Sequence, residues 1–197
     1  MFNMIGGAIK ARLENAKGRV SLKEGDVTAA MKSFQEAVRI AKENHPSSML
    51  AAGSYNKIGG VLWNMGDLVG ALEHYQLALA IEEVNAPKSL ALAASYNNIG
   101  AVLKHKGDLD GALEQYQLAL AIKEVKAPNS STLATSYNNI GIVLQEKGDF
   151  NGALERHQRA LAIQEIKAPN SLEVAGSYNN IGVVLKHKGD LDGALDY

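Results

Sequence analysis

Asparagine side chains recur in this sequence at a constant spacing, and their chemistry suits the recognition of peptide backbones. They form the pairs Asn97-Asn98, Asn138-Asn139 and Asn179-Asn180, which follow one another at 41 residues, with Asn56-Lys57 one step earlier. An asparagine amide carries both a donor and an acceptor, so it can pair with a backbone N–H and C=O together. A series of such amides could therefore hold an extended peptide. The same amides could instead bridge neighbouring repeats, or be copies left by duplication.

Other side chains are weaker candidates for binding. Trp63 stands where Lys104 and Lys186 stand in later repeats; aromatic residues dominate binding hot spots, but simple packing explains Trp63 equally well. The dipeptides Lys104-His105 and Lys186-His187 could attract acidic residues of a peptide, or merely complement the negative ends of helices. Neither histidine has a second ligand at metal-binding spacing, so we expect no metal site.

Composition and motifs argue against several classes of function. The acidic residues Glu73, Glu114 and Glu155 recur at equivalent positions that we expect to be exposed, and no nucleophile–base pair or phosphate-binding loop is present. A net charge of −1 offers no basic stripe for nucleic acid, and the absence of cysteine excludes disulfides and thiolate metal sites. No segment has the pattern of a secretory signal or of a membrane span. We therefore expect a cytoplasmic, non-enzymatic protein without cofactors.

The elements that position the asparagines belong to a repeat of 41 residues. The same step separates Tyr55, Tyr96, Tyr137 and Tyr178, the turn glycines Gly25, Gly66, Gly107, Gly148 and Gly189, and Pro46, Pro87, Pro128 and Pro169. A fixed period of about 20–50 residues is typical of solenoids, in which each unit buries its apolar face against its neighbours.

Each repeat is predicted to be a pair of antiparallel helices. In residues 89–106, Leu92, Tyr96, Ile99 and Leu103 recur at spacings of four and three, which is one face of a helix. Ser89 is the expected N-cap, and Gly107-Asp108 should break the chain between the two helices. The second helix should end near Lys126, because the proline that follows at 128 cannot continue it. The predicted units are 1–47 (a diverged cap), 48–88, 89–129, 130–170 and 171–197 (incomplete).

The repeat resembles a known family. Tyr96-x2-Ile99-Gly100-x2-Leu103 followed by Ala112-x3-Tyr116-x2-Ala119 resembles the tetratricopeptide repeat pattern, with aromatic and aliphatic exchanges. The period exceeds the usual 34 residues by about two helical turns, which keeps the apolar faces in phase. Such lengthened repeats are similar to those of kinesin light chains and related cargo adaptors. His157 replaces the aromatic residue found as Tyr75 and Tyr116.

The resemblance implies an all-α, right-handed solenoid in which the first helix of each pair lines a concave groove. It would place the asparagine pairs in that groove, with Asn98, Asn139 and Asn180 facing a ligand most directly. Chaperone-binding members of the family would want asparagine where Gly60, Ala101, Ile142 and Val183 stand, so a co-chaperone role is not expected.

The expected function is that of a scaffold or adaptor that binds a partner peptide in this groove, and the basic dipeptides would suit an acidic peptide. An alternative is an architectural subunit that uses its convex face or its ends, and a weaker one is the regulatory region of a larger enzyme. The chain stops at Tyr197, inside the fifth unit, which indicates either a fragment of a longer array or an end completed by another chain, with possible end-to-end association. The near-identity of residues 104–113 and 186–195 favours the longer array.

Overall fold

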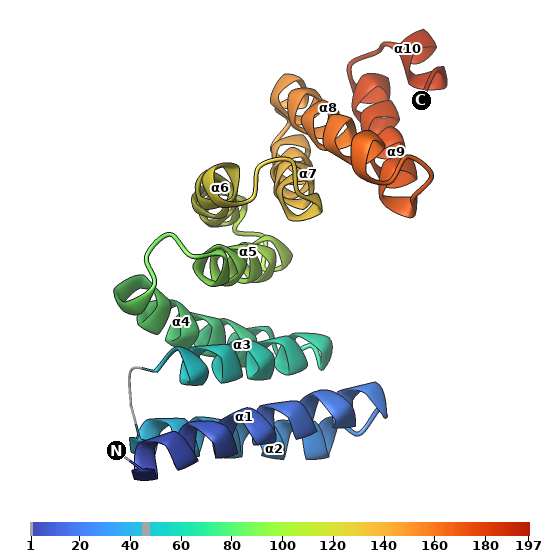
Figure 1. Cartoon of the computed structure of the whole chain (residues 1–197). Coiled ribbons are helices and arrows are strands. Elements are labelled where there is room, and N and C mark those ends of the chain that lie inside the picture. The colour runs from blue at the N-terminus through green and yellow to red at the C-terminus, as the bar shows by residue number, and fades with distance from the viewer. Residues whose placement is uncertain (1, 45–47) are drawn as a thin grey trace. The chain divides into compact units, whose positions relative to one another are not determined.

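The computed structural model describes residues 2–44 and 48–197, and within them all regular structure is helical (Figure 1). The helices are α1 (Phe2–Lys23), α2 (Val27–Asn44), α3 (Met49–Asn64), α4 (Leu68–Asn85), α5 (Leu90–His105), α6 (Leu109–Lys126), α7 (Ser131–Glu146), α8 (Phe150–Lys167), α9 (Leu172–His187) and α10 (Leu191–Leu195). The prediction of an all-α fold built from helix pairs is confirmed. Pro46, the first proline of the 41-residue series, lies outside the described residues.

Capping residues set the helix boundaries at nearly the same place in every repeat. Ser89 Oγ accepts a hydrogen bond from the N–H of Leu92 at 3.1 Å, as predicted for an N-cap. Between the paired helices, Gly107 has a φ of 84°, the left-handed conformation that ends a helix. Asp108 then caps the following helix, because its carboxylate accepts from the N–H of Gly111 at 2.9 Å. These caps repeat at the equivalent Gly66-Asp67, Gly148-Asp149 and Gly189-Asp190.

The chain divides into two compact units, residues 1–102 and 103–197, and the division falls within α5. In the first unit α1 packs on α2, α2 on α3, and α3 on α4. Its core includes Phe34, Ile58 and Val61, all buried. In the second unit α6 packs on α7, α7 on α8, and α8 on α9. Its cores include Ile140 and Ile181, and burying each such side chain contributes roughly 1.5–3 kcal/mol.

Glycine permits close approach inside the helix pairs. A Cβ added at Gly59 would lie 2.6 Å from the ring of Tyr75, and one at Gly141 would lie 2.6 Å from the ring of His157. The ring of each second helix therefore rests directly on the backbone of the first helix. This explains the small residue of the repeat pattern, since any side chain there would push the two helices apart.

Candidate functional site

The first asparagine of the repeated pair joins neighbouring repeats. In three places its Nδ2 donates to the hydroxyl of a serine 39 residues later, on the first helix of the next repeat. These pairs are Asn15–Ser54 at 2.7 Å, Asn56–Ser95 at 2.8 Å and Asn138–Ser177 at 3.0 Å. These asparagines therefore bridge neighbouring repeats, which is one of the alternatives that the sequence left open. Asn15 was missed, although it lies one 41-residue step before Asn56.

At two of these contacts a third polar side chain, from the second helix of the pair, also bonds the serine: Glu82 at Ser95 and Gln164 at Ser177. Glu82 is almost fully buried; its carboxylate accepts from Ser95 Oγ at 2.6 Å and from Asn56 Nδ2 at 3.1 Å. Burial raises the pKa of Glu82, and its two hydrogen bonds only partly offset that effect. Periodicity could not identify this residue, because its counterparts are Ala41, Lys123 and Gln164.

Lys123 and Gln164 occupy the same place in the second unit. Lys123 is buried and its Nζ donates to Ser136 Oγ at 2.7 Å, while burial lowers the pKa of its ammonium group. Gln164 accepts from Ser177 Oγ at 2.6 Å. We call these contacts, each formed by an asparagine or a second-helix polar residue with the serine of the next repeat, the inter-repeat polar contacts. Their role is to satisfy polar groups that packing removes from water.

His157 extends one of these contacts into the core. Its side chain is fully buried, and its Nδ1 lies 3.0 Å from Asn138 Oδ1. Because an amide oxygen can only accept, the ring carries its proton on Nδ1 and donates to Asn138. Burial lowers the pKa of His157 to about 4, so the ring is neutral at pH 7. Its Nε2 is buried without a hydrogen-bond partner.

The second position of the repeated pair is partly exposed throughout, at Lys57, Asn98, Asn139 and Asn180. The first position is partly exposed too at Asn56, Asn97 and Asn138, so exposure alone does not separate the two positions. Lys57 Nζ donates to the carbonyl of Gly53 at 2.8 Å, and burial together with the charge of Arg19 lowers its pKa. In the second unit, Asn139 on α7 and Asn180 on α9 stand at equivalent positions of two helices that contact each other.

The other predicted binding residues each have their own local surroundings. Trp63 is partly exposed near the end of α3, and His105 is exposed at the end of α5. Lys104 forms an ion pair with Glu146 at 3.4 Å. His187 stacks on Phe150 with ring centroids 5.1 Å apart. At these two positions, therefore, a basic side chain contacts the neighbouring repeat.

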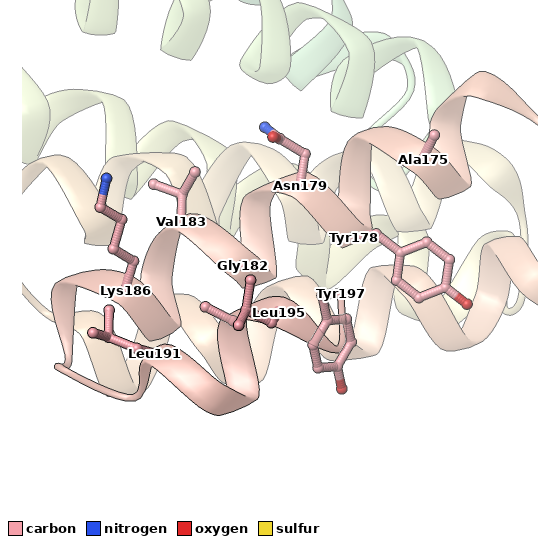
Figure 2. Close-up of a pocket in the computed structure, with 10 residues that line it drawn as sticks. Ala175, Tyr178, Asn179, Gly182, Val183, Lys186, Leu191, Leu195 and Tyr197 are labelled. Atoms are coloured by element: carbon pink, nitrogen blue, oxygen red, sulfur yellow. The ribbon is translucent and has the colours of Figure 1, made fainter.

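Helix α9, the first helix of the last repeat, borders an open pocket of about 610 Å³ (Figure 2). Its lining combines apolar side chains of α10, such as Leu191 and Leu195, with Asn179 and Lys186 of α9. In Figure 2 the side chains of Asn179 and Lys186 rise from α9 on the side away from α10 and Tyr197. Asn179 stands at the first position of the pair, but it is more exposed than Asn56 and Asn138 at the same position.

The described residues contain neither a cluster of metal-ligand side chains nor a helix that could cross a membrane. Across residues 2–44 and 48–197 no group of three or more His, Asp or Glu side chains could hold a metal ion. No described helix is long and apolar enough to cross a bilayer. The recurring acidic residues Glu73, Glu114 and Glu155 are exposed, as expected.

Comparison with known proteins agrees with the repeat geometry. Tetratricopeptide repeat models match residues 50–124 and 132–197, and a second such model matches residues 11–44. No curated protein matches the sequence.

Several solved structures share the fold. BtubC (BKLC) from P. vanneervenii has a TM-score of 0.88 and 26% identity, covering 98% of this chain and 78% of that protein. A Podosopora anserina protein described as a kinesin light chain with nearly identical TPR-like repeats has a TM-score of 0.78 and 16% identity, covering 94% and 90%. MamA has a TM-score of 0.69 and 18% identity, covering 95% and 87%.

The matched residues span most of the chain, and the structural neighbours include proteins with kinesin-light-chain repeats. The chain therefore belongs to the tetratricopeptide repeat family, and its fold is an all-α solenoid of the lengthened, kinesin-light-chain-like type.

Proposed function

We propose that this protein–protein interaction module binds a segment of a partner protein along the exposed side of its first helices, through the second position of the repeated pair. The observation that supports the proposal is the placement of the second-position amides: Asn139 and Asn180 are partly exposed and stand at equivalent positions of two first helices that contact each other. Asn138, by contrast, bonds Ser177 of the next repeat.

The chemistry of this position fits a peptide backbone better than a particular side chain. Asn139 and Asn180 present amides from adjacent helices of the second unit. Each amide can donate to a backbone carbonyl and accept from a backbone N–H, which would hold an extended segment with little demand on its sequence. In the first unit the equivalent residues are Lys57 and Asn98, where Lys57 replaces the amide with a cation.

The test begins with identification of the partner. Proteins captured by the full chain are mapped with overlapping peptides, and the affinity of the best peptide is measured for wild type and for Asn139→Ala with Asn180→Ala. We expect the double variant to bind at least about tenfold more weakly, because each lost hydrogen bond contributes on the order of 1 kcal/mol. Its helicity should be unchanged, since both residues are partly exposed.

A matched control is available one residue away. Asn138→Ala removes an inter-repeat polar contact, so it should lower stability while leaving the affinity of the folded protein nearly unchanged. An architectural subunit would give the opposite result: stoichiometric neighbours would be captured, no peptide would bind, and Asn139→Ala with Asn180→Ala would have no effect.

A further inference from the structure

Helix α1 exposes a stripe of aliphatic side chains on the side opposite its core contacts. Ile9, Leu13 and Val20 are 59%, 54% and 53% exposed. Their spacing of four and seven residues places them on one helical face. Ala11 and Asn15, by contrast, are buried on the side that faces the rest of the first unit. We call Ile9, Leu13 and Val20 the α1 apolar stripe.

The part of this face that holds Leu13 and Val20 is covered in the later first helices. The residues equivalent to Val20, at 41-residue steps, are Val61, Val102, Val143 and Val184, and each is at most 2% exposed. In the first unit α3 packs this side on α2, and in the second unit α7 packs on α6 and α9 on α8. The occupant that fits the α1 apolar stripe is therefore also a helix.

The stripe differs from these later first helices at two positions: at Ile9, whose equivalents are Leu50, Ala91, Thr132 and Glu173, and at Leu13. Where α1 has Leu13, the later first helices have Ser54, Ser95, Ser136 and Ser177, all fully buried and hydrogen-bonded. A preceding repeat of this chain's own kind would bring an asparagine amide against Leu13, where no hydroxyl could satisfy it. The stripe therefore suits a helix that presents apolar side chains alone.

The charged residues that flank the α1 apolar stripe indicate the charge that a docking helix should carry. On an ideal helix with about 100° per residue, Arg12, Arg19 and Lys23 flank the stripe on one side, and Lys10 and Lys17 flank it on the other. The single acidic residue of α1 is Glu14, which pairs with Lys17 at 2.6 Å. The helix thus carries a formal charge of +4 on a chain whose net charge is −1.

We propose that the α1 apolar stripe docks an acidic amphipathic helix of a partner protein, at a surface separate from the asparagine positions. Aliphatic side chains of that helix would cover Leu13 and Val20, and acidic side chains on its flanks would meet the basic residues of α1. A second copy that pairs its α1 with this α1 is a poor occupant, because the two helices would bring like charges together.

The probe for this proposal is a synthetic helical peptide of about 18 residues, with leucine at spacings of three and four and glutamate on both flanks. A second peptide carries lysine in place of each glutamate. Binding to the full chain is measured by fluorescence anisotropy at low and physiological salt. We expect the glutamate peptide to bind at least about tenfold more tightly than the lysine peptide, and to weaken as salt rises.

Variants of the protein locate the contact. Leu13→Ser with Val20→Ser should weaken binding of the glutamate peptide by about tenfold or more, and so should Arg12→Glu with Arg19→Glu. Val125→Ser is the control, because this valine is exposed on α6 and lies outside the stripe. All of these positions are exposed, so the urea midpoints should match that of wild type.

Four results would overturn the proposal. The first is equal binding of the two peptides, and the second is binding of the glutamate peptide that Leu13→Ser with Val20→Ser leaves unchanged. The third is binding of the chain to vesicles containing phosphatidylserine but not to the glutamate peptide, which would assign the stripe to a membrane surface. The fourth is a dimer, seen by sedimentation, that Leu13→Ser with Val20→Ser dissociates, which would assign the stripe to a second copy.

Discussion

Asn138 Nδ2 lies 3.0 Å from Ser177 Oγ, so one hydrogen bond ties α7 to α9 across two successive repeats. The relationship recurs between Asn15 and Ser54 and between Asn56 and Ser95. Asn138, which the sequence suggested as a ligand contact, therefore joins two successive repeats of the fold. Its neighbour Asn139, at the second position, is the one that we assign to binding.

The first prediction concerns the stability of this contact. Ser177→Ala should lower the free energy of unfolding by about 1–2 kcal/mol, because Asn138 and Gln164 both lose their hydroxyl partner in a buried place. Asn180→Ala, on the same helix but partly exposed, should change it by less than about 0.5 kcal/mol. Urea denaturation followed by circular dichroism measures both. Equal effects of the two substitutions would refute the assignment.

The second prediction concerns the buried carboxyl of Glu82. Its pKa is raised in the folded state, so stability is fully present below the unfolded pKa near 4.5 and falls as pH rises through the folded pKa. Glu82→Gln should therefore be more stable than wild type at pH 7, by about 1 kcal/mol. The difference should disappear toward pH 4. A constant difference at every pH would show that the carboxylate charge is not its cause.

The third prediction concerns His157, whose pKa is shifted in the direction that favours the neutral ring. Above about pH 6.5 neither the folded nor the unfolded state binds the proton, and stability is at its full value. As pH falls from 6.5 toward about 4, the unfolded state takes up the proton first, and up to about 3 kcal/mol is lost.

His157→Tyr tests this loss, because Tyr116 occupies the equivalent position of the preceding repeat. The variant should remove most of the difference in unfolding free energy between pH 7 and pH 4.5, measured against wild type in urea. An unchanged difference would place the acid sensitivity on other groups.

The fourth prediction uses two glycines that differ in their surroundings. Gly141→Ala should lower stability by about 1–3 kcal/mol, because the new methyl group would meet the ring of His157 at 2.6 Å. Gly176→Ala is the matched control on α9, where nothing lies within 4 Å of the added Cβ. That change should raise stability by about 0.5–1 kcal/mol through helix propensity alone. Thermal unfolding distinguishes the two signs.

The sequence predicted the helix pairs well, because the same local signals recur in every repeat. Ser89, Gly107 and Asp108 act through contacts a few residues away, which a linear pattern records directly. The resemblance to tetratricopeptide repeats also identified the family correctly.

The sequence predicted the candidate site less completely, because its contacts join residues far apart along the chain. Glu82 could not be found from periodicity, since an alanine, a lysine and a glutamine stand at its equivalent positions. The pairing of Lys104 with Glu146 needs the register between two repeats, which no single repeat contains. The two asparagines of a pair look alike in sequence, and only the three-dimensional arrangement separates their environments.

We propose that Asn138 and Asn139 have separate roles, the first in stability and the second in binding. The most direct measurement compares Asn138→Ala with Asn139→Ala for two properties at once: the urea midpoint, and the affinity for a partner peptide mapped from captured proteins. We expect Asn138→Ala to lower the midpoint and preserve affinity, and Asn139→Ala to preserve the midpoint and weaken binding several-fold. If both substitutions changed stability and affinity together, or if Asn139→Ala changed neither, the separation of roles would be contradicted.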